Sequence, residues 1–309
     1  MRISVIGLGK LGKPIFNVFK ENGYKVTGID LYDPYKDLGE ISFVVVPTPS
    51  KKDNKFISEY VENVLDKIKE KHIVAIVSTL MPGETDRLQK KYPHLTLVYN
   101  PTFVALGSVK HDFTHPDFIL IGGNDKEAVK LVEKILLSVC FIKNGFAIMT
   151  PLEAEIAKLT LNCYITTKIT FANQIGNLCY RLGIKPDNIL EAVGRDRRVG
   201  SEYFKAGLGY GGPCFPRDNL ALSAYMKDNG MIPELAKTVN SLNNLQIYEM
   251  VGRVIKLKPK IVGFESLSYK EGTDCEEYSH LKAIYTQLKE RGYKVRIGKG
   301  DVTLDWRGL

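Results

Sequence analysis

The first stretch of the chain decides the fold, and it reads Arg2-Ile3-Ser4-Val5-Ile6-Gly7-Leu8-Gly9-Lys10-Leu11-Gly12. A mainly apolar strand pattern leads into glycines spaced Gly-x-Gly-x-x-Gly, and a helical pattern follows to about residue 22. The first glycine permits a tight turn, the second lets a pyrophosphate approach the backbone, and the third lets helix and strand pack closely. The N-terminus of the helix attracts phosphates. The stretch therefore predicts a dinucleotide site at Gly7, Gly9, Leu11 and Gly12.

Asp30 indicates which dinucleotide binds. It ends the next strand pattern, residues 24–30, and follows the last glycine by 30 − 12 = 18 residues. A carboxylate there can hold the ribose hydroxyls of NAD and repels the extra phosphate of NADP, so we expect NAD. Ligands of open parallel sheets bind beyond the carboxyl ends of the strands. We therefore expect Pro47, Thr48 and Thr79, which follow the third and fourth strand patterns, to face the same cofactor.

The remaining pattern divides the chain into three predicted domains. Strand patterns at 41–46, 73–78, 95–99 and 118–121 alternate with helical patterns at 58–71 and 126–137. This alternation predicts an α/β, Rossmann-like, doubly wound parallel sheet over residues 1–150. Helical periodicity at 151–182, 187–193, 219–230 and 233–257 predicts an all-helical central module over 151–257, with one long helix. A strand, helix and strand at 261–264, 279–291 and 293–297 predict a truncated βαβ domain over 258–309, which weakly echoes the first segment.

Composition excludes several classes of protein. Of the 309 residues 44% are hydrophobic and 25% are charged, which excludes a disordered chain, a collagen and a disulfide-stapled miniprotein. Lys and Arg number 43 against 35 Asp and Glu, so the net charge of +8 admits nucleic acid or a phosphorylated small molecule. The lysines are dispersed without interleaved aromatic residues, so we expect no nucleic acid as a partner.

The cysteines and the apolar runs indicate a cytoplasmic protein without a metal site. The chain has 5 cysteines, an odd number without a CxxC pair, which fits neither a zinc site nor a disulfide framework. No apolar run approaches the ~20 residues that span a bilayer, and the N-terminus is a strand pattern instead of a signal peptide. We therefore expect no membrane association and a reducing cytoplasm.

The most specific motif is the run Phe204-Lys205-Ala206-Gly207-Leu208-Gly209-Tyr210-Gly211-Gly212-Pro213-Cys214-Phe215-Pro216-Arg217-Asp218. Four glycines precede a cysteine, and a basic–acidic pair follows it. A free cysteine is usually a small buried hydrophobic residue, but that role does not explain the flanking loop. Such a loop can wrap a sugar closely and present one thiol.

With this loop the sequence resembles the nucleotide-sugar 6-dehydrogenases, the UDP-glucose and GDP-mannose dehydrogenases. The resemblance covers nearly the whole chain and runs through Val46-Pro47-Thr48-Pro49, Ser78-Thr79, Asn100-Pro101, Lys158, Asn162 and residues 261–270. It implies oxidation of a sugar C6 alcohol to a carboxylate with two NAD per product. UDP-glucose, which would give UDP-glucuronate for polysaccharide synthesis, is the default substrate because it is the commonest in the family.

The resemblance also implies roles for individual residues. Cys214 would capture the aldehyde as a thiohemiacetal that is oxidised to a thioester, while Lys158 and Asn162 would stabilise the oxyanion. Asp218 would assist proton transfer, Thr79 would position water and cofactor, and Lys270 would contact the cofactor. Arg198 would reach the substrate of a neighbouring subunit, which implies a homodimer built on helix 151–182. The implied substrate-binding residues are Lys158, Asn162, Arg198, Tyr203, Lys205, Gly209, Tyr210, Gly211 and Gly212.

The sequence departs from the family at several positions. Thr102 replaces the glutamate of the family's Asn-Pro-Glu-Phe motif, which is implicated in thioester hydrolysis, and Leu106 occupies a second acidic position. Arg217 replaces a lysine, Glu277 replaces a cofactor-binding arginine, and the segment between residues 30 and 41 is short. In one interpretation the enzyme is active, and His111, His115 or ordered water replaces the glutamate. In the other, hydrolysis is slow or the protein only binds nucleotide sugar. The β-hydroxyacid dehydrogenases share the glycine turn and a Lys-x-x-x-Asn pair but lack the Cys214 loop.

Overall fold

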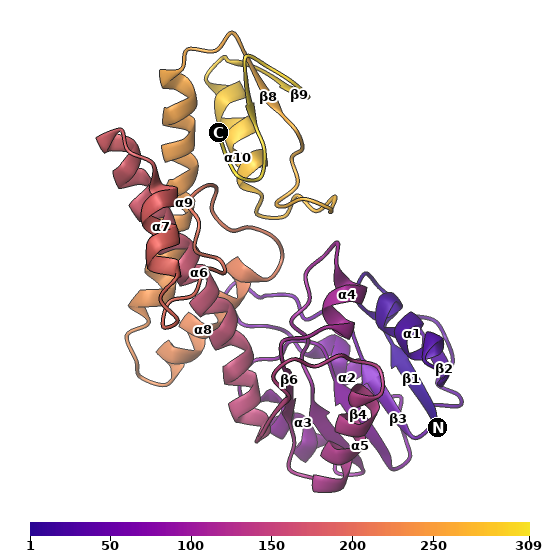
Figure 1. Ribbon diagram of the computed structural model, residues 1–309. Coiled ribbons are helices and arrows are strands. Elements are labelled where there is room, and N and C mark those ends of the chain that lie inside the picture. Colours follow the sequence, from indigo (N-terminus) through magenta and orange to yellow (C-terminus); the bar gives the residue numbers. More distant parts are fainter. The chain divides into compact units, whose positions relative to one another are not determined.

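The computed structural model describes residues 1–309 and divides the chain into two compact units, Met1–Lys158 and Leu159–Leu309 (Figure 1). The first unit contains the predicted dinucleotide-binding segment. The second contains most of the predicted helical module and the C-terminal strands. The domain boundary expected at residue 257 stays a prediction.

The first unit is built on a seven-stranded sheet of order β2-β1-β3-β4-β5-β6-β7. Its strands are β1 (Arg2–Ile6), β2 (Lys25–Ile29), β3 (Ile41–Val44), β4 (His72–Ile76), β5 (Leu95–Tyr99), β6 (Ile119–Gly122) and β7 (Phe146–Met149). Its helices are α1 (Gly12–Glu21), α2 (Glu59–Leu65), α3 (Glu84–Lys91), α4 (Val109–Thr114) and α5 (Lys126–Leu137). The strands from β2 to β5 are parallel, so the predicted doubly wound α/β sheet is confirmed.

One strand departs from the predicted parallel arrangement. β6 pairs antiparallel to β5 through Tyr99 and Gly122, and β7 runs parallel to β6. The connection from β5 contains only the six-residue α4. No long helix carries the chain back to the amino-terminal end of β5. The chain therefore enters β6 from the end at which β5 finishes, and β6 runs antiparallel to it.

Two apolar clusters cover the two faces of this sheet. One joins Phe43 of β3 to Phe19 of α1 and to residues of α4 and α5. The other joins Tyr99 of β5 to Leu65 of α2 and Leu88 of α3. Helices thus bury both faces, which leaves the loops at the carboxyl ends of the strands to bind ligands.

The short segment between β2 and β3 crosses β1 without a helix. The hydroxyl of Ser4 donates to the carbonyl of Leu38 at 2.6 Å, and a Cβ at Gly39 would overlap the carbonyl oxygen of Arg2.

The second unit repeats the arrangement of β1, α1, β2 and β3, in which the first strand lies between the other two. Its elements are β8 (Ile261–Phe264), α10 (His280–Glu290), β9 (Lys294–Ile297) and β10 (Val302–Leu304). These strands form a parallel sheet of order β10-β8-β9. The segment from β9 to β10 crosses β8 at Gly300, where a Cβ would overlap the backbone of Gly263. The expected echo of the first segment is confirmed.

The long helix is also confirmed. α6 (Pro151–Leu182) begins in the first unit and continues into the second, which adds α7 (Pro186–Gly194), α8 (Phe215–Asp228) and α9 (Glu234–Lys256). α8 begins at Phe215 instead of the predicted residue 219, because Pro216 fits the first turn of a helix. None of the helices is both long and apolar enough to cross a bilayer.

Candidate active site

The glycine turn of the first unit has the predicted geometry. Gly7 adopts a φ of +95°, which favours glycine, and a Cβ at Gly12 would overlap the carbonyl oxygen of Gly7. A Cβ at Gly9 would instead face open space, with no atom within 4 Å. α1 begins at Gly12, with Leu11 as an N-cap residue that makes no side-chain cap. The turn therefore presents open backbone at the start of a helix.

Asp30 lies exposed just after β2, as the cofactor prediction requires. Its carboxylate accepts a hydrogen bond from the backbone N–H of Leu31 at 3.0 Å. Together with burial, the Asp30 charge raises the pKa of Tyr35 to about 12. The carboxylate is thus placed at the sheet edge, where a ribose of a bound dinucleotide would lie.

The loops after β3 and β4 are tied to each other. Ser78 accepts the backbone N–H of Val46 at 2.9 Å, and the hydroxyl of Thr48 donates to the carbonyl of Thr79 at 2.7 Å. The structure therefore brings Thr48 and Thr79 together, with Pro47 between these contacts. The hydroxyls of Thr48 and Ser78 join the two loops, and the contact of Pro47, Thr48 and Thr79 with a cofactor stays a prediction.

Lys158 is held by the loop after β5. The residue is 7% exposed, and its Nζ donates to the carbonyl of Thr102 at 2.7 Å. The same Nζ lies 4.4 Å from the centre of the Phe103 ring. A buried ammonium is thus positioned at the carboxyl end of the sheet, beside the residue that departs from the family motif.

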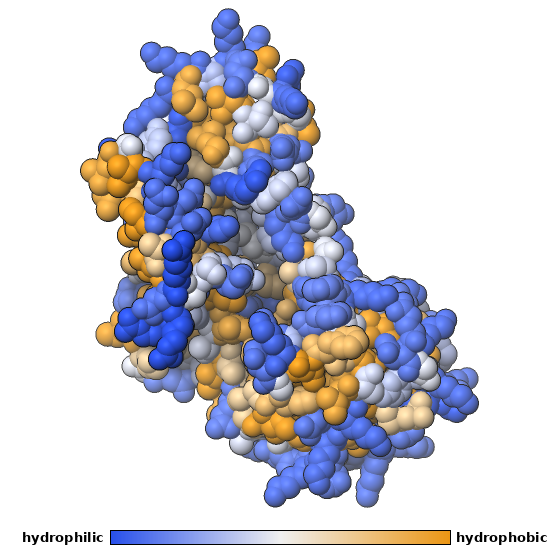
Figure 2. Space-filling view, in the orientation of Figure 1, coloured by the Kyte–Doolittle hydropathy of each residue, from blue (hydrophilic) through white to orange (hydrophobic).

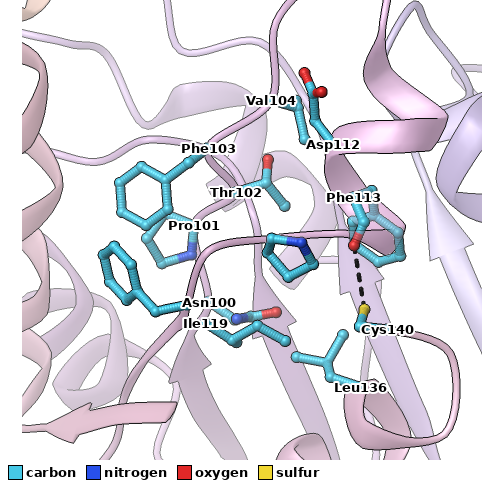
Figure 3. Close-up of a pocket in the computed structure, with 12 residues that line it drawn as sticks. Asn100, Pro101, Thr102, Phe103, Val104, Asp112, Phe113, Ile119, Leu136 and Cys140 are labelled. Atoms are coloured by element: carbon cyan, nitrogen blue, oxygen red, sulfur yellow. Dashed lines mark hydrogen bonds between the residues drawn. The ribbon is translucent and has the colours of Figure 1, made fainter. Parts of the chain in front are cut away.

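Thr102 also lines a cavity of the first unit together with Asp112 (Figure 3). Figure 3 shows the Thr102 hydroxyl and the Asp112 carboxylate pointing away from Leu136. Asp112 accepts hydrogen bonds from the N–H of Ala105 at 2.9 Å and the hydroxyl of Ser108 at 2.7 Å. The carboxylate beside Thr102 is therefore Asp112, which the sequence did not single out.

The two histidines suggested as replacements for the glutamate do not line this cavity. The rings of His111 and His115 stack with their centres 4.8 Å apart, and the His111 side chain is 73% exposed. Their role as a base stays a prediction.

The second unit places the predicted nucleophile at a helix start. Cys214 is exposed and is the N-cap residue of α8, a position that favours negative charge. One turn later, Asp218 is 1% exposed and accepts a hydrogen bond from the side-chain amide of Asn162 at 2.6 Å. Arg217 lies 3.6 Å from the same carboxylate. The carboxylate and the amide predicted to act together are thus bonded to each other, and Cys214 lies one helical turn before the carboxylate.

Two of the other cysteine thiols, those of Cys140 and Cys163, are poorer candidates for a nucleophile. Burial raises the pKa of Cys140 to about 12. Burial, with the nearby Asp218 charge, also raises the pKa of Cys163. Because the thiolate is the reactive form, these two thiols are suppressed while Cys214 is accessible.

The glycine loop before Cys214 is held by buried side chains that the sequence analysis missed. Asn243 accepts the backbone N–H of Tyr210 and donates to its carbonyl, each at 2.9 Å. The ring of His280 accepts the N–H of Gly209 at 3.1 Å, and the carbonyl of Glu277 accepts the N–H of Gly212 at 2.9 Å. Asn173 accepts the N–H of Gly207 at 2.8 Å and donates to the carbonyl of Leu208 at 3.1 Å. Gln246 donates to the carbonyl of Gly207 at 2.7 Å. These contacts hold the backbone of the loop in place. Substrate binding by Gly209–Gly212 stays a prediction.

Polar residues on an otherwise apolar helix face were the available signal for this support. Asn240, Asn243 and Gln246 recur every three residues on α9, and Asn243 and Gln246 are buried. Such residues are retained inside a protein only when their hydrogen bonds are satisfied.

The remaining predicted residues lie at the surface of the second unit or close beneath it. Tyr203 is exposed with a φ of +59°, and its ring packs edge-on against Phe215 with centres 6.4 Å apart. Lys205 is exposed, Arg198 pairs with Asp196 at 2.7 Å, and Lys270 is half-buried. Their binding roles stay predictions.

Comparison with known proteins matches segments of both units to one protein family. Residues 32–139 match the NAD binding domain of the UDP-glucose/GDP-mannose dehydrogenase family, and residues 152–245 match its central domain. The UDP-glucose 6-dehydrogenase of Rickettsia conorii is 30% identical over 93% of this chain and 68% of that protein. The chain belongs to the UDP-glucose/GDP-mannose dehydrogenase family. The first unit therefore carries the family's NAD-binding domain, and the resemblance noted from the sequence is confirmed.

Other members show how far the similarity extends. The UDP-glucose 6-dehydrogenase of Rickettsia bellii is 32% identical over 83% of this chain, which spans 62% of that protein. The structure of a UDP-glucose dehydrogenase from Pyrobaculum islandicum has a TM-score of 0.86 and 28% identity, covering 99% of this chain and 82% of that one. A UDP-D-ManNAc dehydrogenase from Pyrococcus horikoshii, with a TM-score of 0.81 at 22% identity, shares the fold.

Proposed function

We propose that the protein oxidises the C6 alcohol of a nucleotide sugar with NAD, and that UDP-glucose is the substrate. The observation that carries this proposal is the exposed Cys214 thiol at the start of α8, one turn before the buried pair of Asp218 and Asn162. An NAD-binding domain alone serves many reactions, whereas a presented thiol beside this pair suits covalent capture of an aldehyde.

The first unit fits NAD. The open backbone at Gly9 leaves room for a pyrophosphate, the start of α1 favours its charge, and Asp30 can accept ribose hydroxyls. NAD, when bound, would supply the hydride acceptor for C6, with one NAD molecule used in each of the two oxidations. The loops at Thr48 and Thr79, which are bonded to each other, would hold its position.

The chain's own residues would perform the remaining chemistry. The Cys214 sulfur would add to the C6 aldehyde to give a thiohemiacetal, whose oxidation gives a thioester. The Lys158 ammonium and the Asn162 amide would donate to the C6 oxygen as negative charge develops there. Asp218 would accept the hydroxyl proton that is released as hydride leaves C6. Water would then hydrolyse the thioester, which releases the carboxylate and returns the Cys214 thiol.

The test measures NADH formation with UDP-glucose, GDP-mannose and UDP-N-acetyl sugars, followed by mass spectrometry of the protein. We expect turnover with one of these nucleotide sugars, and we expect that sugar to be UDP-glucose. Cys214→Ala should abolish the second oxidation, whereas Cys275→Ala, which changes a partly buried cysteine of the same unit, should retain it. Unchanged turnover in Cys214→Ala would refute the proposal.

A specific observation favours a second candidate, in which oxidation proceeds but hydrolysis is slow. Thr102 has no carboxylate to activate water, and its carbonyl accepts the Lys158 ammonium. The nearby Asp112 carboxylate already accepts two hydrogen bonds from the loop at Ala105 and Ser108. Position 102 therefore supplies no base for the hydrolytic water.

The two candidates predict different time courses. Slow hydrolysis should give a burst of two NADH per subunit and a sugar adduct on Cys214 that mass spectrometry detects. Thr102→Glu should then restore steady turnover, with Thr102→Gln as the uncharged control. Steady wild-type turnover without an adduct would exclude this candidate, and absence of NADH with every sugar would favour a silent nucleotide-sugar binder.

We further propose that the protein is a homodimer through α6. Tyr164, Phe171 and Leu178 are 58%, 55% and 52% exposed, and their spacing of seven residues places them on one face of the helix. Figure 2 shows apolar surface over the end of α6 and over α7. A face of large apolar side chains marks an association site more often than a solvated surface.

Sedimentation measures this association directly. We expect a wild-type dimer and a monomeric Phe171→Lys variant, while Leu137→Lys, at a similarly exposed residue of α5, should stay dimeric. A monomeric wild type would refute the proposal. The reach of Arg198 to a neighbouring substrate and the cytoplasmic location stay predictions.

A further inference from the structure

Glu155 is a fully buried carboxylate in the first turns of α6. Its exposure is 0%, and it accepts three hydrogen bonds from the start of α3. The donors are the N–H of Gly83 at 2.6 Å, the N–H of Thr85 at 2.7 Å and the hydroxyl of Thr85 at 2.6 Å. Gly83 is the N-cap residue of α3 and has no side chain to cap it, so Glu155 performs this function from another helix.

These contacts fix the end of a loop of the proposed cofactor site. The loop after β4 runs from Ser78 to Gly83 and contains Thr79, whose carbonyl binds Thr48 in the neighbouring loop. Glu155 holds the far end of the same loop. Three residues later on α6, Lys158 binds the loop after β5 through the carbonyl of Thr102.

Residues three apart on a helix lie on the same face, so two adjacent turns of α6 hold two adjacent loops of the sheet. Glu155 holds the loop after β4, and Lys158 holds the loop after β5. Since β4 and β5 are neighbours in the sheet, the spacing of these loops is set by the start of α6.

We infer that Glu155 is a positioning residue that keeps Thr79 and the cofactor loop in register with Lys158. This inference rests on the proposed binding of NAD to the first unit. Loss of the Gly83 contact frees the loop end, so cofactor affinity should fall although Glu155 does not touch the cofactor.

Glu155→Gln removes one defined contact. The glutamate binds Thr85 through one oxygen and Gly83 through the other. A glutamine can keep its oxygen toward Thr85, but its amide N–H₂ then faces the N–H of Gly83, and two donors repel. Thr85→Val is a second, milder variant, because it removes the hydroxyl donor and keeps the shape of the side chain.

Protonation should imitate this substitution. Burial and, to a smaller extent, the Asp86 carboxylate of α3 raise the pKa of Glu155 to about 7, against the lowering effect of its three hydrogen bonds. Below that pH the protonated oxygen becomes a donor, as the glutamine nitrogen is. The wild type at pH 6 should therefore behave like Glu155→Gln, whose own affinity should not change between pH 6 and 8.

The test is a fluorescence titration with NADH at pH 8 and pH 6, together with hydrogen exchange of residues 78–91. At pH 8 we expect Glu155→Gln to raise the Kd for NADH about tenfold, as loss of one charge-assisted hydrogen bond predicts. Thr85→Val should raise it less. The control is Glu153→Gln, an exposed residue that caps α6 itself through Thr150, and it should leave the Kd within about twofold.

Three results separate the possibilities. Wild-type affinity in Glu155→Gln, or an equal pH dependence in both proteins, would overturn the inference. If the wild type does not bind NADH, the proposed function fails and exchange still decides the structural role. Faster exchange at Gly83 in Glu155→Gln, without faster exchange in Glu153→Gln, would then support the positioning role, and unchanged exchange would refute it.

Discussion

Asn243→Ala should destabilise the second unit strongly. Asn243 is 5% exposed and forms both hydrogen bonds to the backbone of Tyr210, which is itself 4% exposed. Alanine leaves a buried N–H and a buried carbonyl without these partners. Each such group costs about 1–3 kcal/mol, so we expect a loss of about 4 kcal/mol and a fall in Tm of roughly 10 °C.

The single tryptophan makes this loss measurable for one unit. Trp306 lies in the second unit, so its fluorescence during urea or thermal unfolding reports on that unit. Asn244→Ala changes the exposed neighbour and should stay within about 0.5 kcal/mol of the wild type. A loss below about 1 kcal/mol in Asn243→Ala would show that the glycine loop does not depend on these two bonds.

Three further predictions follow from the described contacts. Gly9→Ala should weaken NADH binding without lowering stability, because its Cβ faces open space, whereas Gly12→Ala should lower both, since its Cβ overlaps backbone; titration and calorimetry separate them. Burial lowers the pKa of His280 from 6.5 to about 4. Protonation therefore opposes folding, and stability in the Trp306 assay should fall by up to about 3 kcal/mol as the pH drops from 6.5 towards 4, with a flatter profile in His280→Gln. A thiol reagent should label Cys214 before Cys140 and Cys163, as peptide mass spectrometry can show, because both of these thiols are buried with raised pKa values.

Much of the fold could be predicted because its signals are local. The glycine turn, the βα alternation and the uninterrupted periodicity of 151–182 each reside in neighbouring residues, and the structure confirms them. The antiparallel β6 could not be predicted in the same way. Its direction depends on where the chain re-enters the sheet after α4, which no local pattern specifies.

The candidate site divides along the same line. Cys214 could be singled out because its loop is a local motif, and the resemblance to the family added Asp218 and Asn162, which the structure joins by a hydrogen bond. Asn243 and His280 lie 33 and 71 residues from the loop residues that they bind. Contacts at such separations depend on tertiary packing, so the supports of the glycine loop were found only in the structure.

The supports of the loop before Cys214 and of the loop that ends at Gly83 have one physical cause. A loop that must approach a ligand closely needs glycine, and glycine supplies no side chain to hold the loop in place. The backbone groups of the loop must then find partners elsewhere, because buried N–H and carbonyl groups without partners are costly. In the second unit Asn243 and His280 fulfil this role for the loop before Cys214, and in the first unit Glu155 does so for the loop that ends at Gly83. Residues remote from the chemistry should therefore affect it through the loops that they hold, which is the outcome that the Glu155 and Asn243 variants test.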